Sequence, residues 1–66
     1  MTLSQPNPAR ATIATLMADG TERTTGDICR ETGLREAEVI HHARRMRKMG
    51  LLSVDRTKVV AIWRKA

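Results

Sequence analysis

The stretch that decides the fold is residues 25–34, TGDICRETGL, followed by residues 35–49, REAEVIHHARRMRKM. The first stretch predicts a short helix, because Thr24 or Thr25 can cap its N-terminus with a hydroxyl group. Gly33 is expected to end this helix at a positive φ, where a residue with a side chain is penalised. The second stretch predicts a longer helix. Two helices joined by so tight a turn indicate a helix-turn-helix unit.

The predicted helix over residues 35–49 has two chemically different faces. Its helical spacing places three apolar side chains on one stripe and His42 at the edge of that stripe; the three are Val39, Ala43 and Met46. The opposite face is mostly cationic, and its centre holds His41, Arg44 and Lys48. We therefore expect the apolar face to pack into a core, with His42 beside it, and the cationic face to point outward.

Upstream of this unit, residues 8–18 predict a first helix. Asn7 is suited to cap it, and Pro8 is suited to the first helical position because its φ is already helical. The apolar stripe of this helix consists of Ala9, Ile13, Leu16 and Met17. Residues 1–6 are predicted to be disordered, and residues 20–23 are predicted to form a polar loop.

Downstream, the periodicity changes after Gly50. Residues 51–54 and 58–63 are rich in β-branched and apolar side chains and predict two short strands, with a turn over residues 55–57. Three helices followed by a hairpin give an α+β fold. We expect this fold to occupy residues 7–66 as one domain.

The core of so small a domain has few sources of stability. The chain has 66 residues, and Cys29 is its one cysteine, so it has no internal disulfide. Cys29, like Ile28, is expected to point inward from its helix. Tyrosine and phenylalanine are absent, so we expect Trp63 and three methionines to fill the core: Met17, Met46 and Met49.

Positive charge is concentrated in the second half of the chain. Residues 1–33 carry three arginines and four acidic residues, whereas residues 34–66 carry nine lysines or arginines and three acidic residues. The formal net charge is +5 at pH 7. A basic half on a small domain is typical of proteins that bind the phosphate backbone of nucleic acids. The alternative is a surface whose charges serve only solubility.

The sequence resembles the bacterial winged helix-turn-helix regulators over roughly residues 8–63. Residues 25–34, residues 39–46 (VIHHARRM) and residues 49–52 (MGLL) carry the resemblance. In the family pattern, a threonine, an Ile-Ala pair and Gly-Leu precede a Val-x-x-His-Leu-x-x-Leu helix closed by Gly-Leu. Ala43 departs from this pattern, because leucine is usual at its position. The resemblance implies a three-helix winged helix-turn-helix with a C-terminal two-stranded wing hairpin, and a DNA-binding transcriptional regulator of bacterial or phage type.

A second resemblance is narrower. The layout, and Trp63 followed by a basic residue, are similar to the Z-alpha domains, which bind left-handed nucleic acid. That family reads the backbone with an asparagine and a tyrosine on the third helix, whereas the matching positions here are Ile40 and Arg44. The proline pair of the Z-alpha wing is also missing. We therefore do not expect binding to left-handed DNA.

The regulator resemblance implies that the third helix enters the major groove and reads base edges with its N-terminal half. By position, the base-reading candidates are Arg35, Glu36, Ile40, His41 and Arg44. An arginine can bond both acceptors of guanine, and a glutamate can accept from the cytosine amino group. The alternative for Arg35 and Glu36 is that they only decorate the exposed start of a helix.

Other polar residues are candidates for contacts to the DNA backbone: Thr24, Thr25, Arg45, Arg47, Lys48, Arg56 and Lys58. The two threonines stand at the start of a helix, where free amides can hold a phosphate. Simple capping is the alternative for them. Arg56 and Lys58 lie at the tip of a hairpin that is expected to be short, so we predict a backbone contact rather than deep insertion into the minor groove.

Several classes of protein are not expected. The chain has no glycine-rich phosphate loop and no nucleophile with a placed base, so we predict no enzyme and no cofactor. His41 and His42 diverge by about 100° on a helix and are not expected to bind a metal together. The sequence has no signal peptide and no apolar stretch near the ~20 residues that span a bilayer, which predicts a cytoplasmic protein.

The expected partner is double-stranded DNA. No helix remains after Trp63 for the dimer contacts of many regulators, so we expect a monomer, a weak pair, or a second copy on an adjacent site. The alternative function is a protein–protein interaction module or a small inhibitor, since winged helices also dock on proteins.

Overall fold

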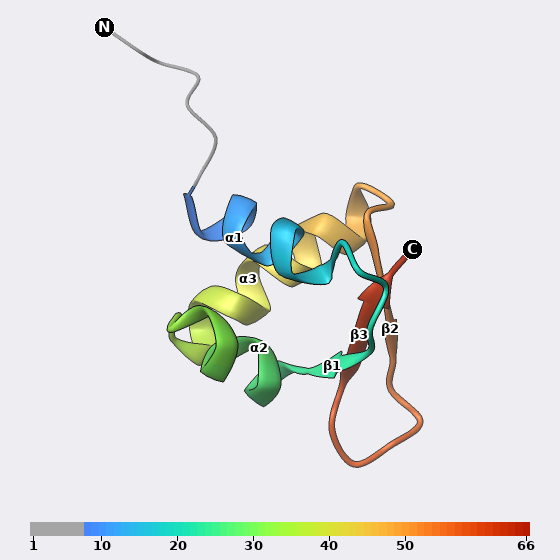
Figure 1. Cartoon of the computed structure of the whole chain (residues 1–66). Coiled ribbons are helices and arrows are strands. Elements are labelled where there is room, and N and C mark those ends of the chain that lie inside the picture. The colour runs from blue at the N-terminus through green and yellow to red at the C-terminus, as the bar shows by residue number, and fades with distance from the viewer. Residues whose placement is uncertain (1–7) are drawn as a thin grey trace, which may run out of the picture.

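Three helices pack beside a small antiparallel sheet (Figure 1). The computed structural model describes residues 8–66, so the predictions for residues 1–6 and for Asn7 lie outside it. The elements are α1 (Pro8–Met17), β1 (Arg23–Thr24), α2 (Thr25–Thr32), α3 (Glu36–Lys48), β2 (Leu52–Asp55) and β3 (Ile62–Lys65). The strand order is β1-β3-β2, and both pairs are antiparallel. The predicted α+β architecture is confirmed.

The two ends of α2 follow the predicted chemistry. Thr24 caps α2: its Oγ1 accepts from the Asp27 amide at 3.0 Å, and the Asp27 carboxylate accepts from the Thr24 amide at 3.1 Å. This reciprocal capping box satisfies two amides at the start of the helix that have no partner in the helix itself. Gly33 ends α2 with φ +75°, and its amide donates to the Cys29 carbonyl at 2.8 Å. The tight turn before α3 is therefore specified locally.

The core lies where the three helices meet the sheet. Eight apolar side chains are buried there: Ile13, Met17, Ile28, Val39, Ala43, Met46, Leu52 and Trp63. The predicted inward faces of α1 and α3 are confirmed, as are the places of Met17, Met46 and Trp63 in the core. Cys29 is only half-buried, because it packs at the margin of this cluster rather than inside it.

Trp63 joins the sheet to the helix-turn-helix. It is 2% exposed, and its indole N–H donates to Oγ1 of Thr25, at the first turn of α2, over 3.0 Å. In the sheet it pairs with Arg23 on one side and with Val54 on the other. One side chain thus fixes the position of the wing relative to α2.

Arg23 is a structural arginine, although its position was expected to belong to a polar loop. Its guanidinium donates to Asp19 and Glu31 at 3.1 Å and to the Leu16 carbonyl at 3.1 Å. The side chain is only 11% exposed. It holds the pKa of Asp19 well below its usual range. Arg23 therefore ties the end of α1 to β1 and α2, and it is not free to bind a ligand.

The wing differs from its prediction. The second strand was expected over residues 58–63, but β3 begins at Ile62, and residues 56–61 form the loop that extends beyond the sheet in Figure 1. The Asp55 carboxylate accepts from the amide and hydroxyl of Thr57, at 2.9 and 2.6 Å, which bends the chain away from strand pairing. The predicted turn over residues 55–57 is therefore a longer loop, and the second strand begins later than predicted.

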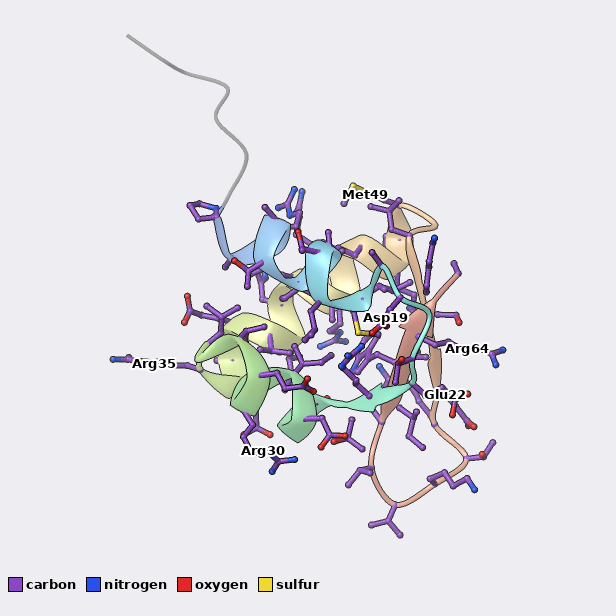
Figure 2. The ribbon with its side chains drawn as sticks, viewed as in Figure 1. Asp19, Glu22, Arg30, Arg35, Met49 and Arg64 are labelled. Atoms are coloured by element: carbon purple, nitrogen blue, oxygen red, sulfur yellow. The ribbon has the colours of Figure 1, made fainter. Side chains whose placement is uncertain are left out.

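Met49 was expected in the core and is instead 51% exposed. It is the C-terminal cap of α3, and Gly50 follows it with φ +80°, which turns the chain toward the sheet. The Leu51 amide then donates to the Met46 carbonyl at 2.9 Å. Met49 is left outside this turn, at the upper edge of the domain in Figure 2.

His42 was expected at the edge of the core and is almost fully buried, with 6% of its surface exposed. Its Nδ1 atom is buried and has no hydrogen-bond partner among the described residues. Burial lowers the pKa of the imidazole below 6.5, and the charges of His41 and Arg10 act in the same direction. The folded domain therefore holds His42 neutral.

We expect the domain to lose stability as the pH falls below about 6.5, because the unfolded chain then binds a proton on His42 that the folded chain rejects. His42→Leu should flatten this dependence in thermal melts between about pH 7.5 and pH 5, whereas His41→Gln, which leaves the burial of His42 intact, should keep most of it. The pKa values of Asp27 and Asp55 are lowered in the folded domain. These two carboxylates therefore make stability depend on pH only below about pH 4, where they lose their stabilising charge. An unchanged slope in His42→Leu would contradict this assignment.

Candidate nucleic-acid interface

Helix α3 presents the candidate base-reading residues on its exposed side. Its first turn carries Glu36 and Glu38, whose negative charges suit the positive end of the helix dipole. The Glu38 carboxylate also accepts from the Arg35 amide at 3.3 Å. These glutamates therefore have a role in starting the helix that is independent of any partner.

Five of the candidate residues line one shallow depression of about 460 Å³ along α3: Ile40, His41, Arg44, Arg45 and Lys48. The exposed Met49 closes its far end. Three cations thus surround a surface with apolar parts. The helical spacing of the sequence predicted that His41, Arg44 and Lys48 share a face, and the structure adds Ile40, Arg45 and Met49 to this group.

A second, smaller depression of about 170 Å³ lies where α3 meets the wing. It is lined by Thr25, Ile40, Arg44, Arg56, Ala61 and Trp63. Ile40 and Arg44 border both depressions, so the two form one continuous surface, which we call the α3–wing surface. No sequence pattern marked Ala61 as part of it, because residues 58–63 were expected to be a single strand.

The remaining candidates lie outside the α3–wing surface. Neither depression is lined by Arg35, Glu36, Arg47 or Lys58. Figure 2 shows Arg35 extending into solvent on the side of the domain away from the strands. All four side chains are exposed, so they remain candidates by position alone.

The two threonines are already engaged inside the domain. Thr24 belongs to the capping box of α2, and Thr25 accepts from Trp63. The Asp27 carboxylate accepts a hydrogen bond from the Thr24 amide and forms an ion pair with Arg30. The hydrogen bonds from Thr24 lower the pKa of Asp27. A negative charge at this helix start opposes a phosphate at the same place. Capping thus accounts for Thr24 without a DNA contact.

We therefore expect Thr24→Ala to destabilise the domain by about 1 kcal/mol, through loss of the cap. It should leave the salt dependence of DNA binding unchanged. Thr24→Ser keeps the hydroxyl and should restore the melting temperature. A salt slope that falls by about one unit in Thr24→Ala would instead assign Thr24 a phosphate contact.

Within residues 8–66, no group of three or more His, Cys, Asp and Glu side chains is arranged to hold a metal ion. None of the helices in this range is long and apolar enough to cross a membrane.

The sequence matches the family model of the bacterial regulatory proteins of the arsR family over residues 7–54. This match covers the helix-turn-helix, the start of the wing and most of the chain. The chain belongs to the arsR family. Membership confirms the predicted regulator family and assigns the chain to the small DNA-binding transcriptional regulators. The arsR family and its fold are those of regulators that are not enzymes. No curated protein sequence matches the chain significantly.

Solved structures support the same fold for this arsR-family chain. A possible transcriptional regulatory protein from Mycobacterium bovis (fragment 1–100) is 25% identical, with a TM-score of 0.81, over 91% of this chain and 63% of that one. A second similar structure is BpsR of Bordetella bronchiseptica, whose DNA binding is described as regulated by 6-hydroxynicotinic acid. It is 17% identical, with a TM-score of 0.84, over 96% of this chain and 46% of that one. The chain thus spans about half to two thirds of these regulators.

The Z-alpha domain of Carassius auratus PKZ, solved in complex with Z-DNA, is also similar. It is 14% identical, with a TM-score of 0.79, over 88% of this chain and 92% of that domain. At this identity the likeness concerns the fold alone.

Proposed function

We propose that this chain regulates transcription by placing α3 in the major groove of double-stranded DNA, with the wing on the neighbouring backbone. The observation that carries the proposal is the α3–wing surface, which brings Arg44, Arg45 and Lys48 of α3 together with Arg56 of the wing. A continuous cationic surface on the exposed face of a helix matches the charge of a DNA groove, which admits a helix.

The roles follow from position. His41 and Arg44, at the centre of α3, are assigned to base edges, and Arg35, Glu36 and Ile40 remain base-reading candidates. Arg45, Lys48 and Arg56 are assigned to phosphates, with Arg47 and Lys58 as further backbone candidates. Arg56 stands at the start of the wing loop, where it can reach the strand beside the groove that α3 occupies.

The proposal also concerns chemistry and location. The chain acts without catalysing a reaction and without a cofactor, and it acts in the cytoplasm, where bacterial DNA lies. It binds as a monomer or beside a second copy on an adjacent site, since each domain carries one recognition helix. Residues 7–66 form the binding unit.

The test is an amide-shift titration of the ¹⁵N-labelled chain with a random DNA duplex at two salt concentrations. We expect shifts concentrated in residues 35–48 and 55–61, and weaker at the higher salt. Shifts restricted to other surfaces would contradict the proposal, and so would an absence of shifts at low salt.

Exposed apolar side chains favour a protein partner as the second candidate. Met49 and Leu51 are each 51% exposed at the end of α3, and Val59 is fully exposed on the wing. A chain that gives no shifts with DNA and binds a host protein through these residues would be an interaction module.

A further inference from the structure

Ile40 is the one large apolar side chain of α3 that lies outside the buried core. It is half-buried, whereas its polar neighbours His41 and Arg44 are exposed. It borders both depressions of the α3–wing surface. A side chain used only for solubility at this position would be polar, so Ile40 marks an apolar spot within a cationic surface.

The smaller depression extends this apolar spot. Its lining includes Ile40, Ala61, Thr25 and Trp63, of which Trp63 is almost fully buried. The indole N–H donates to Thr25 at 3.0 Å, so it is not available to bond a base. Ile40 and Ala61 are half-buried, so their hydrocarbon groups supply apolar surface to the depression.

The rim of the smaller depression is charged. Arg44 stands on the α3 side and Arg56 on the wing side, and the ion pairs of the described residues involve neither. These cations suit phosphates or guanine edges, and Ile40 and Ala61 add apolar surface to the same depression. The volume of about 170 Å³ corresponds to about six water molecules at roughly 30 Å³ each, which suits the edge of a base.

One group in the major groove is apolar: the methyl at C5 of a pyrimidine. Resting on the proposed function, we propose that Ile40 contacts the 5-methyl group of a pyrimidine at the depression that it lines together with Ala61. Thymine and 5-methylcytosine share this group. Ile40 is thereby a specificity-determining residue, while Arg44 and Arg56 hold the DNA on either side.

The test measures binding by fluorescence anisotropy to two matched pairs of duplexes at one salt concentration. The first pair is an alternating A–T duplex and its A–U counterpart, which lacks only the thymine methyl groups. The second pair is an alternating G–C duplex with and without 5-methylcytosine. We expect the methylated member of at least one pair to bind about fourfold more tightly, the effect of burying one such group.

Two variants assign the difference to Ile40. Ile40→Ala should bring the methyl-dependent ratio close to one with an unchanged salt slope, and Ile40→Val should keep part of it. Val59→Ala removes apolar volume from the wing loop instead and should keep the full ratio. A melting curve of each variant verifies that it is folded.

The outcomes separate this inference from the proposed function. Tighter binding to the methylated member of the first pair would identify thymine as the base that Ile40 contacts. Tighter binding to the methylated member of the second pair would identify 5-methylcytosine. Equal binding within both pairs, with a normal salt dependence, overturns the role of Ile40 and leaves DNA binding intact. A ratio that survives in Ile40→Ala also overturns it. No binding to any duplex at low salt overturns the proposed function itself.

Discussion

Trp63→Ala should remove about half or more of the domain's free energy of unfolding. Removing a buried tryptophan costs about 3–5 kcal/mol, and a domain of this length is stable by roughly 3–10 kcal/mol in total. The cost falls in the upper part of this range, because Trp63 packs in the core and bonds Thr25, whose hydroxyl loses its donor. Circular dichroism and thermal melts measure the loss.

Trp63→Phe is the matched control. It keeps an aromatic ring in the core and removes the indole N–H, so it should cost about 1 kcal/mol beyond the effect of the smaller ring volume. Thr25→Ser keeps the acceptor and should be close to the parent chain. If the free energy of unfolding of Trp63→Ala lay within about 1 kcal/mol of that of the parent chain, the position of the wing would not depend on Trp63.

The largest effect on binding is expected from Arg44→Ala combined with Arg45→Ala. Each side chain is assigned a DNA contact worth about 1–3 kcal/mol, so affinity for a duplex should fall at least about 30-fold. The slope of log affinity against log salt should become shallower by about 0.9 for each phosphate that the variant no longer neutralises. Anisotropy titrations at three salt concentrations give both quantities.

Arg64→Ala combined with Lys65→Ala is the control for net charge. It removes the same two charges from β3, where Arg64 pairs with Glu22 at 3.6 Å and lines neither depression of the α3–wing surface. Figure 2 shows Arg64 extending from the sheet toward Glu22. This control should reduce affinity far less than the α3 variant does. Equal losses would mean that only overall charge matters, and full binding by the α3 variant would refute the DNA-binding role of α3.

The helical half of the fold was predictable because its signals are local. The capping box of Thr24, the positive φ of Gly33 and the spacing of Val39 and Met46 each depend on a few neighbouring residues. Residues of α3 that lie on the α3–wing surface were predictable for the same reason. Once the core face is known, helical geometry places the side chains of the opposite face.

The wing was harder to predict because its strands depend on distant partners. Val59 and Val60 have high β propensity, yet no strand lies opposite them, since the register ends with Asp55 paired to Ile62. The two-residue strand β1 exists only through its pairing with β3, about forty residues later. The contributions of Ala61 and Trp63 to the α3–wing surface depend on that pairing as well.

The central position of β3 in the sheet bears on how the chain folds in the cell. Arg23 pairs with Trp63 and Leu52 pairs with Lys65, so both edge strands form only when the last residues of this sequence are present. While residues 62–65 are still inside the ribosome, the three helices have neither their tryptophan nor their sheet. We therefore expect the sheet to form only after β3 has emerged, and a chain that ends before Ile62 to lack both the sheet and the buried Trp63.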